Sequence, residues 1–350
     1  MTRQEQRFEK TARAEQIETF LAQAAWGTAA RTPLAGDASS RRYERLDHPS
    51  RGPAVLMDAD ATQLESTRAF LRIAQHLRAS GLSTPQILAK DLDHGLLLLE
   101  DLGDDLFARL TRTDLSLEPT LYAAAIDVLA CLHRIPPPGD LPLYGPDRMA
   151  PLAALAIEWY AARQDAPAST ATPQALSDAC HTVLMRAAPE TSVMVFRDYH
   201  AENLLWLPTR SGQARVGLLD FQDAALGHPG YDVVSLLADA RRDVTPETRA
   251  AMMRRYIDLT GHAEDSFAAA CAALSAQRNL RILGVFARLS LRDAKTGYLG
   301  LIPRVWAHLQ RDLAHPVCAP LRAVAEAHLP PPTDRWLSDL RKRAGTCQTP

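Results

Sequence analysis

The sequence predicts an α+β protein of two lobes, a small one with a five-stranded antiparallel sheet and a helix, and a large, mostly helical one. Three observations predict this fold class. The chain has 350 residues, more than one hydrophobic core usually serves. Short apolar segments separated by turn residues fill residues 29–100. Beyond residue 102 the chain becomes alanine-rich with helical spacing.

The small lobe begins with a leading helix and three short strands. Residues 5–26 carry apolar side chains at helical spacing, among them Ile17, Phe20 and Leu21. Segments 29–34, 42–46 and 53–57 follow, and turn residues separate them as in an antiparallel meander. This pattern predicts the first half of a sheet.

A helix and two more strands complete the small lobe. Residues 62–80 return to helical periodicity, and Gly81 is placed to end the helix. Segments 86–92 and 96–100 then predict strands, the second an unbroken leucine run. We therefore assign residues 1–102 to an N-terminal lobe with a leading helix.

The second lobe is predicted to be helical around a few short strands. Helices are expected near 106–110, 119–133, 151–163 and 173–187, with Pro-rich loops at 135–151 and 165–173, and strands at 193–196 and 214–219 around a short apolar piece at 204–207. Helices fill the remainder of a C-terminal lobe, residues 103–330. The Pro-rich, charged tail at 331–350 is expected to be poorly ordered.

Charge and cysteine content narrow the possible partners and location. The net charge is −2, which offers no broad positive field for nucleic acid or anionic lipid. The five cysteines are scattered without a C-x-x-C pair, and a polar N-terminus precedes no long apolar run. We expect a cytoplasmic monomer that acts on a small molecule, without nucleic-acid or membrane partners.

One set of polar residues carries the chemistry. Asp198 and Asn203 stand five residues apart in a loop after an apolar strand, and Asp220 closes the next strand but one. Most isolated Asp and Asn residues only form turns. The chain has just two asparagines, however, so Asn203 is unlikely to stand at this spacing by accident. Phosphoryl transfer needs a carboxylate for the acceptor's proton and oxygen ligands for Mg²⁺.

Several segments resemble a known family. Residues 196–207, 219–224 and 227–232 resemble the aminoglycoside-phosphotransferase and choline-kinase-like superfamily, over roughly residues 15–330. More narrowly, residues 36–43, 55–59 and 197–203 resemble bacterial cell-wall recycling kinases that phosphorylate N-acetylmuramate and N-acetylglucosamine at the anomeric hydroxyl. The resemblance implies a protein-kinase-like bilobal fold, with residues 1–102 as the nucleotide-binding lobe and residues 103–330 as the catalytic and acceptor-binding lobe.

The resemblance also implies the cofactors and their residues. ATP and Mg²⁺ are expected, with Asp198 as catalytic base and Asn203 and Asp220 as magnesium ligands. Residues implied to bind ATP are Gly36, Ser39, Ser40 and Arg41 in the phosphate loop, and Glu100, Asp101 and Leu102, whose backbone would clamp adenine. The predicted activity is an ATP-dependent sugar 1-kinase of peptidoglycan recycling.

Two departures from the family pattern stand out. Gly36 is the only glycine of the phosphate loop, and the third strand lacks the lysine that would pair the nucleotide phosphates. Either Arg41 or Arg42 supplies that charge, with Glu65 as a possible orienting partner, or the protein is catalytically silent.

Weaker candidates surround this core set. His200 and Glu202 would reach the acceptor or shape the loop, Asp223 would touch the acceptor or cap a turn, and Asp232 favours a structural role. Arg281, Arg288 and Arg292 share a helical face close to Arg278, for which a solvated face is the favoured interpretation. If that face lines the acceptor cleft, Arg288 suits an anionic substrate such as the lactyl carboxylate of muramate.

Two alternatives remain open from sequence. The acceptor could be an aminoglycoside, choline or a homoserine-like alcohol, because fold and phosphate machinery do not fix it. The missing lysine also allows a nucleotide-binding pseudokinase that serves as a scaffold.

Overall fold

The computed structural model describes residues 3–34, 41–59, 64–162 and 171–347 and divides the chain into two compact units. Unit 1 comprises Met1–Leu106 and Leu204–Asp223, and unit 2 comprises Phe107–Asn203 and Ala224–Pro350. This division differs from the expected one because the segment Leu204–Asp223 groups with the N-terminal residues.

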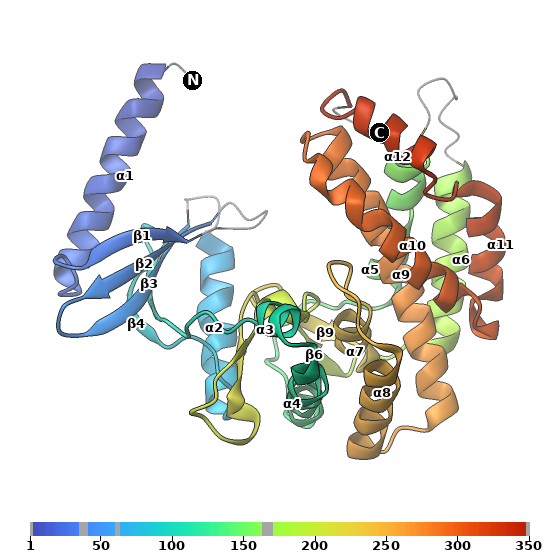
Figure 1. Ribbon diagram of the computed structural model, residues 1–350, viewed down its shortest axis with the longest axis horizontal. Helices are drawn as coiled ribbons and strands as arrows, with labels where there is room; N and C mark the ends of the chain where they lie inside the picture. Colours follow the sequence, from blue (N-terminus) through green and yellow to red (C-terminus); the bar gives the residue numbers. More distant parts are fainter. Residues whose placement is uncertain (1–2, 35–40, 60–63, 163–170, 348–350) are drawn as a thin grey trace. The chain divides into compact units, whose positions relative to one another are not determined.

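Unit 1 contains the five-stranded antiparallel sheet that the sequence predicts. Its strands run in the order β1-β2-β3-β5-β4 (Figure 1). Their bounds are β1 (Ala30–Leu34), β2 (Arg42–His48), β3 (Gly52–Asp58), β4 (Ile87–Asp91) and β5 (Leu96–Glu100). The leucine run forms β5 beside β3, with Leu56 opposite Leu98. All four of its leucines are buried, as expected for a strand covered on both faces.

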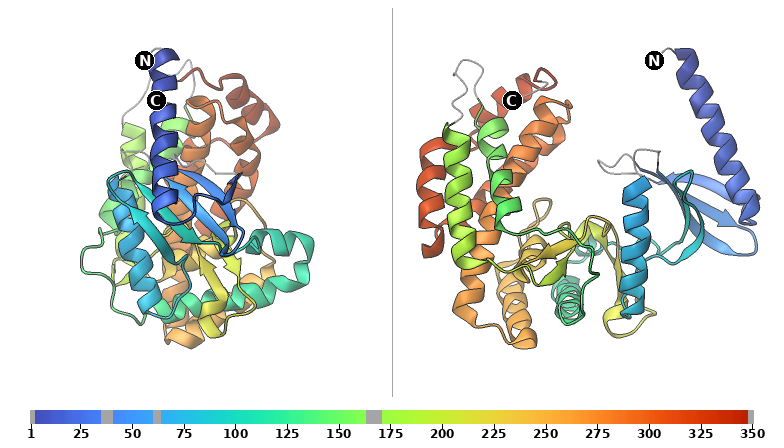
Figure 2. Two further views of the ribbon diagram at one scale, coloured as in Figure 1. Left: turned by 90° about the vertical axis from the view of Figure 1, so that its left-hand side faces the viewer. Right: turned by 180° about the vertical axis from the view of Figure 1, so that it is seen from behind.

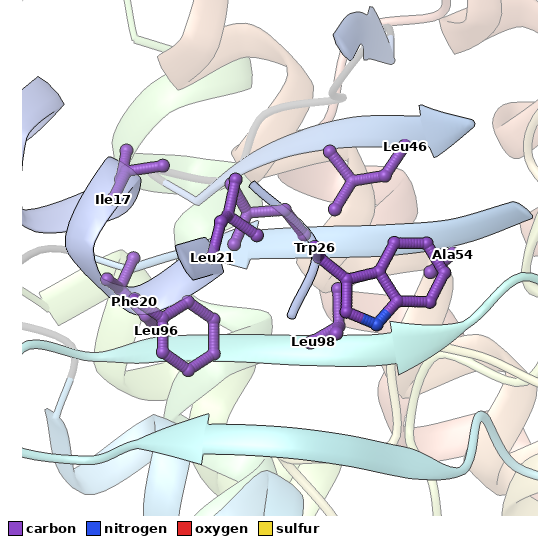
Figure 3. Packing of buried hydrophobic residues seen from close by; sticks show 9 residues of the cluster. Ile17, Phe20, Leu21, Trp26, Leu46, Ala54, Leu96 and Leu98 are labelled. Atoms are coloured by element: carbon purple, nitrogen blue, oxygen red, sulfur yellow. The ribbon is translucent and has the colours of Figure 1, made fainter. Parts of the chain in front are cut away.

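The leading helix α1 (Arg3–Gln23) covers one face of this sheet. Ile17, Phe20 and Leu21 pack there with Trp26 against a set of buried strand residues (Figure 3). The strand residues are Leu46, Ala54, Leu56, Leu96 and Leu98. They alternate along β3 and β5, because successive strand side chains point to opposite faces.

Helix α2 (Leu64–Ala79) lies on the other side of the sheet from α1 (Figure 1). It stops where predicted, since Gly81 adopts φ 78°, a left-handed conformation that ends helices. The hairpin of β7 (Leu204–Trp206) and β8 (Val216–Leu218) joins unit 1 at this point. Phe70 of α2 stacks on Phe221, with ring centroids 4.7 Å apart.

Unit 2 is mostly helical, as predicted. Its helices are α3 (Phe107–Thr113), α4 (Glu118–Leu132), α5 (Pro146–Ala153), α6 (Ala171–Ala187), α7 (Gly230–Leu237), α8 (Pro246–Thr260), α9 (Glu264–Leu291), α10 (Ile302–Leu313), α11 (Ala319–His328) and α12 (Asp334–Lys342). Two short strands, β6 (Val193–Val195) and β9 (Ala225–Gly227), pair antiparallel. Figure 2 shows α6 and α11 side by side within this unit.

The long helix α9 packs very closely against a π-helical turn at Ala156–Tyr160 and the residue before it. A Cβ atom at Gly284 would lie 2.3 Å from the backbone carbonyl of Leu155. Glycine is therefore required for this approach. The contact fixes the position of α9, which carries Arg278 and Arg281.

Some boundaries differ from the predicted ones. The helix expected from residue 151 begins at Pro146, inside the expected loop, because proline is well tolerated in a first helical turn. The expected tail instead contains α12, whose Leu340 is fully buried. Most of the loop expected at 165–173 lies outside the described residues, and α6 begins at Ala171.

One stretch, Leu115–Leu132, is long and apolar enough to cross a membrane by length and composition alone. It includes Glu118 and Asp127, and half of it is buried inside the protein. A buried core helix passes the same test, so this stretch is weak evidence for a membrane span.

Candidate active site

The loop that carries Asp198 is held by a buried carboxylate of α7. Both oxygens of Asp232 accept hydrogen bonds from the loop backbone, from the Phe196 N–H at 2.6 Å and the Arg197 N–H at 2.9 Å. Burial raises the pKa of Asp232 to about 7 against the effect of these two bonds. Asp232 therefore has the structural role that the sequence favours, as the anchor of this loop.

The loop also closes on itself. The Asn203 side-chain amide donates from Nδ2 to the Asp198 carbonyl oxygen at 2.9 Å, and the Asn203 N–H donates to the His200 carbonyl at 2.9 Å. The second bond forms part of a 3₁₀ turn at Ala201–Asn203. The five-residue spacing seen in the sequence is thus the span of one closed loop, and within the described residues the Asn203 Oδ1 oxygen has no hydrogen-bond partner.

The Asp198 carboxylate lies in a positive electrostatic environment. Burial acts to raise its pKa, but the charges of Arg281, Arg278, His200 and Arg197 outweigh burial and hold the pKa below the ordinary value. Asp198 is consequently ionised at neutral pH. An ionised carboxylate is the form that accepts a proton from an acceptor hydroxyl.

The arginines of α9 do not form the solvated face that was favoured from sequence. Arg278 is only 4% exposed and Arg281 is half-buried. Arg292 is exposed and pairs with Asp293 at 2.8 Å, so it alone fits the solvated interpretation. Arg288 is half-buried, and its role toward an acceptor stays a prediction. The buried positions depend on which face of α9 packs inward, which the spacing did not reveal.

His200 is buried, whereas Glu202 is half-buried and lines a cavity. His200 is 5% exposed, lies 3.4 Å from an Arg241 nitrogen, and burial lowers its pKa. Glu202 lies 3.7 Å from Arg112. It lines a cavity of about 530 Å³, together with Arg112, Arg241, Arg304 and other residues of unit 2. Contact of either residue with an acceptor stays a prediction.

Asp220 belongs to unit 1, at the end of β8. Its backbone adopts φ 55°, unusual for a residue other than glycine, and its Oδ1 accepts a hydrogen bond from Gln222 at 2.7 Å. The neighbouring Phe221 is fully buried and fixes this turn against α2. Asp223 is exposed, and its role stays a prediction. Convergence of Asp198, Asn203 and Asp220 on one metal ion likewise stays a prediction, since they belong to different units.

The two candidate arginines of unit 1 differ sharply in environment. Arg41 is 5% exposed and donates a short hydrogen bond to Ser66 Oγ of α2. Burial raises the pKa of Tyr43, Arg41 opposes that rise and Asp220 adds to it, so these three side chains are neighbours. Arg42 is exposed on β2. Glu65, the suggested orienting residue, pairs with Arg68 at 2.9 Å.

Strand β3 carries no lysine or arginine and ends in a carboxylate. Asp58 ends β3 and binds Arg13 of α1, with Nη2 and Oδ1 2.5 Å apart. Gly36, Ser39 and Ser40 lie outside the described residues.

At the end of β5 the side chains of Glu100 and Asp101 are paired within unit 1, and the Glu100 N–H donates to the Gln86 carbonyl oxygen at 2.8 Å. Glu100 binds Arg210 at 2.6 Å, and Asp101 binds Arg45 at 2.6 Å. In the part of the chain that the structure describes, the Leu102 N–H and C=O have no hydrogen-bond partner. Backbone groups of this kind fit the predicted adenine clamp.

Sequence reasoning missed Tyr144 and Tyr231, which join the arginines beside Asp198. The Arg197 guanidinium lies 4.7 Å from the Tyr144 ring centroid, and the two tyrosine hydroxyls are 3.4 Å apart. Tyr231 follows a Gly-His-Pro-Gly segment and directly precedes Asp232, and this position is the sequence feature that could have identified it. Tyr144 stands in a segment expected to be a loop, and no feature of the sequence around it indicates a functional role.

Comparison with known proteins agrees with this geometry. The model of the phosphotransferase enzyme family matches residues 30–268. The chain is 39% identical to the N-acetylmuramate/N-acetylglucosamine kinase of Caulobacter vibrioides, over 90% of this chain and 96% of that protein. A protein of the same name from Pseudomonas aeruginosa is 34% identical, over 85% of this chain and 88% of that protein.

Solved structures share the fold. A choline kinase from Streptococcus pneumoniae superposes with a TM-score of 0.57 at 13% identity, covering 85% of this chain and 99% of that chain. An aminoglycoside phosphotransferase with bound ADP gives 0.57 at 16% identity, covering 85% of this chain and 97% of that chain. These likenesses confirm the predicted protein-kinase-like fold. Since the family model matches most of the chain and named kinases are 39% and 34% identical to it, this chain belongs to the phosphotransferase enzyme family.

Proposed function

We propose that this protein is an ATP-dependent sugar kinase that transfers the γ-phosphate to the anomeric hydroxyl of N-acetylmuramate, N-acetylglucosamine or both, in cytoplasmic peptidoglycan recycling. The observation that carries the proposal is the Asp198 carboxylate, ionised among arginines in a loop closed by Asn203. Relatives that bear this kinase name align with nearly the whole chain, which supports the choice of acceptor.

Asp198 is the proposed catalytic base. Its carboxylate would orient the anomeric hydroxyl and receive its proton as the oxygen attacks the γ-phosphorus. The bonds from Phe196 and Arg197 to Asp232 fix the start of this loop before any substrate binds. Such fixing lowers the cost of reaching a reactive geometry.

The donor set fits ATP with Mg²⁺. Leu102 has an open backbone N–H and C=O for adenine, and Asn203 Oδ1 and the Asp220 carboxylate are the hard oxygen ligands that Mg²⁺ prefers. When bound, the metal would neutralise charge on the nucleotide phosphates. We propose that Leu102, Asn203 and Asp220 come together around the nucleotide when it binds.

Arg41 is the proposed replacement for the missing lysine. It is buried, oriented by Ser66 and a neighbour of Tyr43 and Asp220, whereas Arg42 is exposed. A guanidinium can donate two parallel hydrogen bonds to phosphate oxygens, so it suits this task.

A panel of acceptors with radiolabelled ATP tests the proposal. N-acetylmuramate and N-acetylglucosamine should gain label at the anomeric position, and their 1-O-methyl glycosides should gain none. The panel also contains an aminoglycoside, choline and homoserine. Label on one of these alcohols, with neither amino sugar labelled, would show that the acceptor has been assigned wrongly.

A further inference from the structure

One cavity of unit 2 touches the catalytic loop and carries more basic than acidic side chains. Its volume is about 530 Å³, and every residue that lines it belongs to unit 2. Among the described residues, the charged ones that line it are Arg112, Glu202, Arg241, Arg242, Asp243 and Arg304. Since four of these groups are guanidiniums and two are carboxylates, the lining favours a ligand with a negative charge.

Two of the four arginines are already neutralised. Arg242 binds the buried carboxylate of Glu118 at 3.0 Å. Arg304 pairs with Asp243 through two hydrogen bonds, at 2.7 and 3.0 Å. These two pairs fix part of the wall and add little net charge to the cavity.

Arg112 is held much more loosely than these two. Its guanidinium lies 3.7 Å from the Glu202 carboxylate, which is too far for a hydrogen bond, and its side chain is 76% exposed. In the part of the chain that the structure describes, this ion pair is the one polar contact of the Arg112 side chain. An exposed pair of this kind contributes little to stability, so a carboxylate of a ligand can replace it at small cost.

The cavity lies next to the loop of the proposed base. Glu202 lines it and directly precedes Asn203, whose side chain donates to the Asp198 carbonyl oxygen at 2.9 Å. The Nε2 atom of His200 lies 3.4 Å from a nitrogen of Arg241, which also lines the cavity. Because the two ends of the loop are joined, an acceptor whose hydroxyl meets Asp198 has this cavity beside it.

We propose that this cavity binds the acidic substituent of the acceptor, with Arg112 binding its carboxylate, and thereby favours N-acetylmuramate over N-acetylglucosamine. The inference rests on the proposed function. The two sugars differ by the lactyl ether on O3 of muramate, which carries a carboxylate and a methyl group. A planar guanidinium donates two parallel hydrogen bonds to a carboxylate, and Arg241 adds positive charge to the same cavity. Leu115, 55% exposed, also lines the cavity and offers the methyl group an apolar contact.

The test compares the two sugars in one variant with a matched control. Arg112→Gln should raise KM for N-acetylmuramate by about tenfold or more, because it removes a charge-assisted hydrogen bond, and should leave kcat/KM for N-acetylglucosamine within about threefold. Arg109→Gln, an exposed residue of the same helix α3 that does not line the cavity, should leave both sugars within threefold. A KM for N-acetylmuramate within threefold of the original in Arg112→Gln, with both sugars still phosphorylated, overturns the inference and leaves the proposed function standing. An equal loss of kcat/KM with both sugars overturns it as well.

A second measurement changes the sugar instead of the protein. The unsubstituted protein should use N-acetylmuramate at least tenfold better, by kcat/KM, than the same sugar with its carboxyl converted to an amide, and Arg112→Gln should lose this preference. Equal use of acid and amide within threefold by the unsubstituted protein overturns the inference even if Arg112→Gln does not fold. If the unsubstituted protein phosphorylates neither amino sugar, the proposed function fails and this inference fails with it.

Discussion

Replacing Asp232 by asparagine tests how the catalytic loop is held. The two Asp232 oxygens accept from the Phe196 and Arg197 N–H groups at 2.6 and 2.9 Å, and the residue is fully buried. Asparagine offers one oxygen and turns an NH₂ group toward the other N–H. One buried donor is then unsatisfied, which costs about 1–3 kcal/mol.

Urea unfolding at pH 6.5 should show this loss in Asp232→Asn. Since a shift of about 1 Å in a catalytic group can cost roughly 10²-fold, kcat should also fall by about that factor. Asp258→Asn, an exposed residue of α8, should change stability by less than about 0.5 kcal/mol. Unfolding of Asp232→Asn within that same margin, with kcat retained, would refute the anchoring role.

The raised pKa of Asp232 adds a pH dependence to this prediction. Its folded pKa of about 7 exceeds the ordinary 3.8, so its stabilising contribution is complete below about pH 4 and is lost as pH rises through 7. His133, His228 and His308, with pKa values lowered by burial to about 3, about 4 and about 4, act oppositely until the unfolded histidines have lost their protons near pH 8. The clean measurement is therefore the difference in the free energy of unfolding between the unsubstituted protein and Asp232→Asn, in which the histidine contributions cancel. That difference should shrink by roughly 1 kcal/mol from pH 6.5 to 8.

Two further predictions concern the nucleotide and the packing of α9. Arg41→Gln should raise KM for ATP by about tenfold or more, because it removes a charge-assisted phosphate contact worth ~1.5–3 kcal/mol. Arg42→Gln should raise KM for ATP much less. Equal effects of the two variants in steady-state kinetics would reject Arg41 as the lysine replacement. Gly284→Ala should lower the free energy of unfolding by about 1–3 kcal/mol, because a Cβ would lie 2.3 Å from the Leu155 carbonyl. A urea midpoint equal to that of the unsubstituted protein would contradict this close packing.

Local pattern was enough to predict the small lobe. Its strands are short apolar segments between turns, and α2 ends at a glycine with positive φ, so each element is determined by neighbouring residues. Within the loop from Asp198 to Asn203, the two hydrogen bonds made by Asn203 span five residues or fewer, so the closure of the loop is equally local. These are the parts for which single-sequence reasoning has a physical basis.

Features that depend on distant packing could not be predicted. Strand β9 has three residues and exists through its pairing with β6. Burial of Arg278 depends on which side of α9 faces inward, and helical spacing alone is compatible with either side. The choice between Arg41 and Arg42 depends on how side chains alternate between the two faces of the sheet at the start of β2. A shift of the strand by one residue would exchange the buried arginine and the exposed one.

The central claim is that Asp198 is the base of an amino-sugar kinase, and one variant tests it most directly. Asp198→Asn should lower kcat for phosphorylation of N-acetylmuramate by ~10²–10⁴-fold, because asparagine cannot accept the proton, while calorimetry shows ATP still bound with unchanged affinity. Turnover by Asp198→Asn equal to that of the unsubstituted protein would contradict the account.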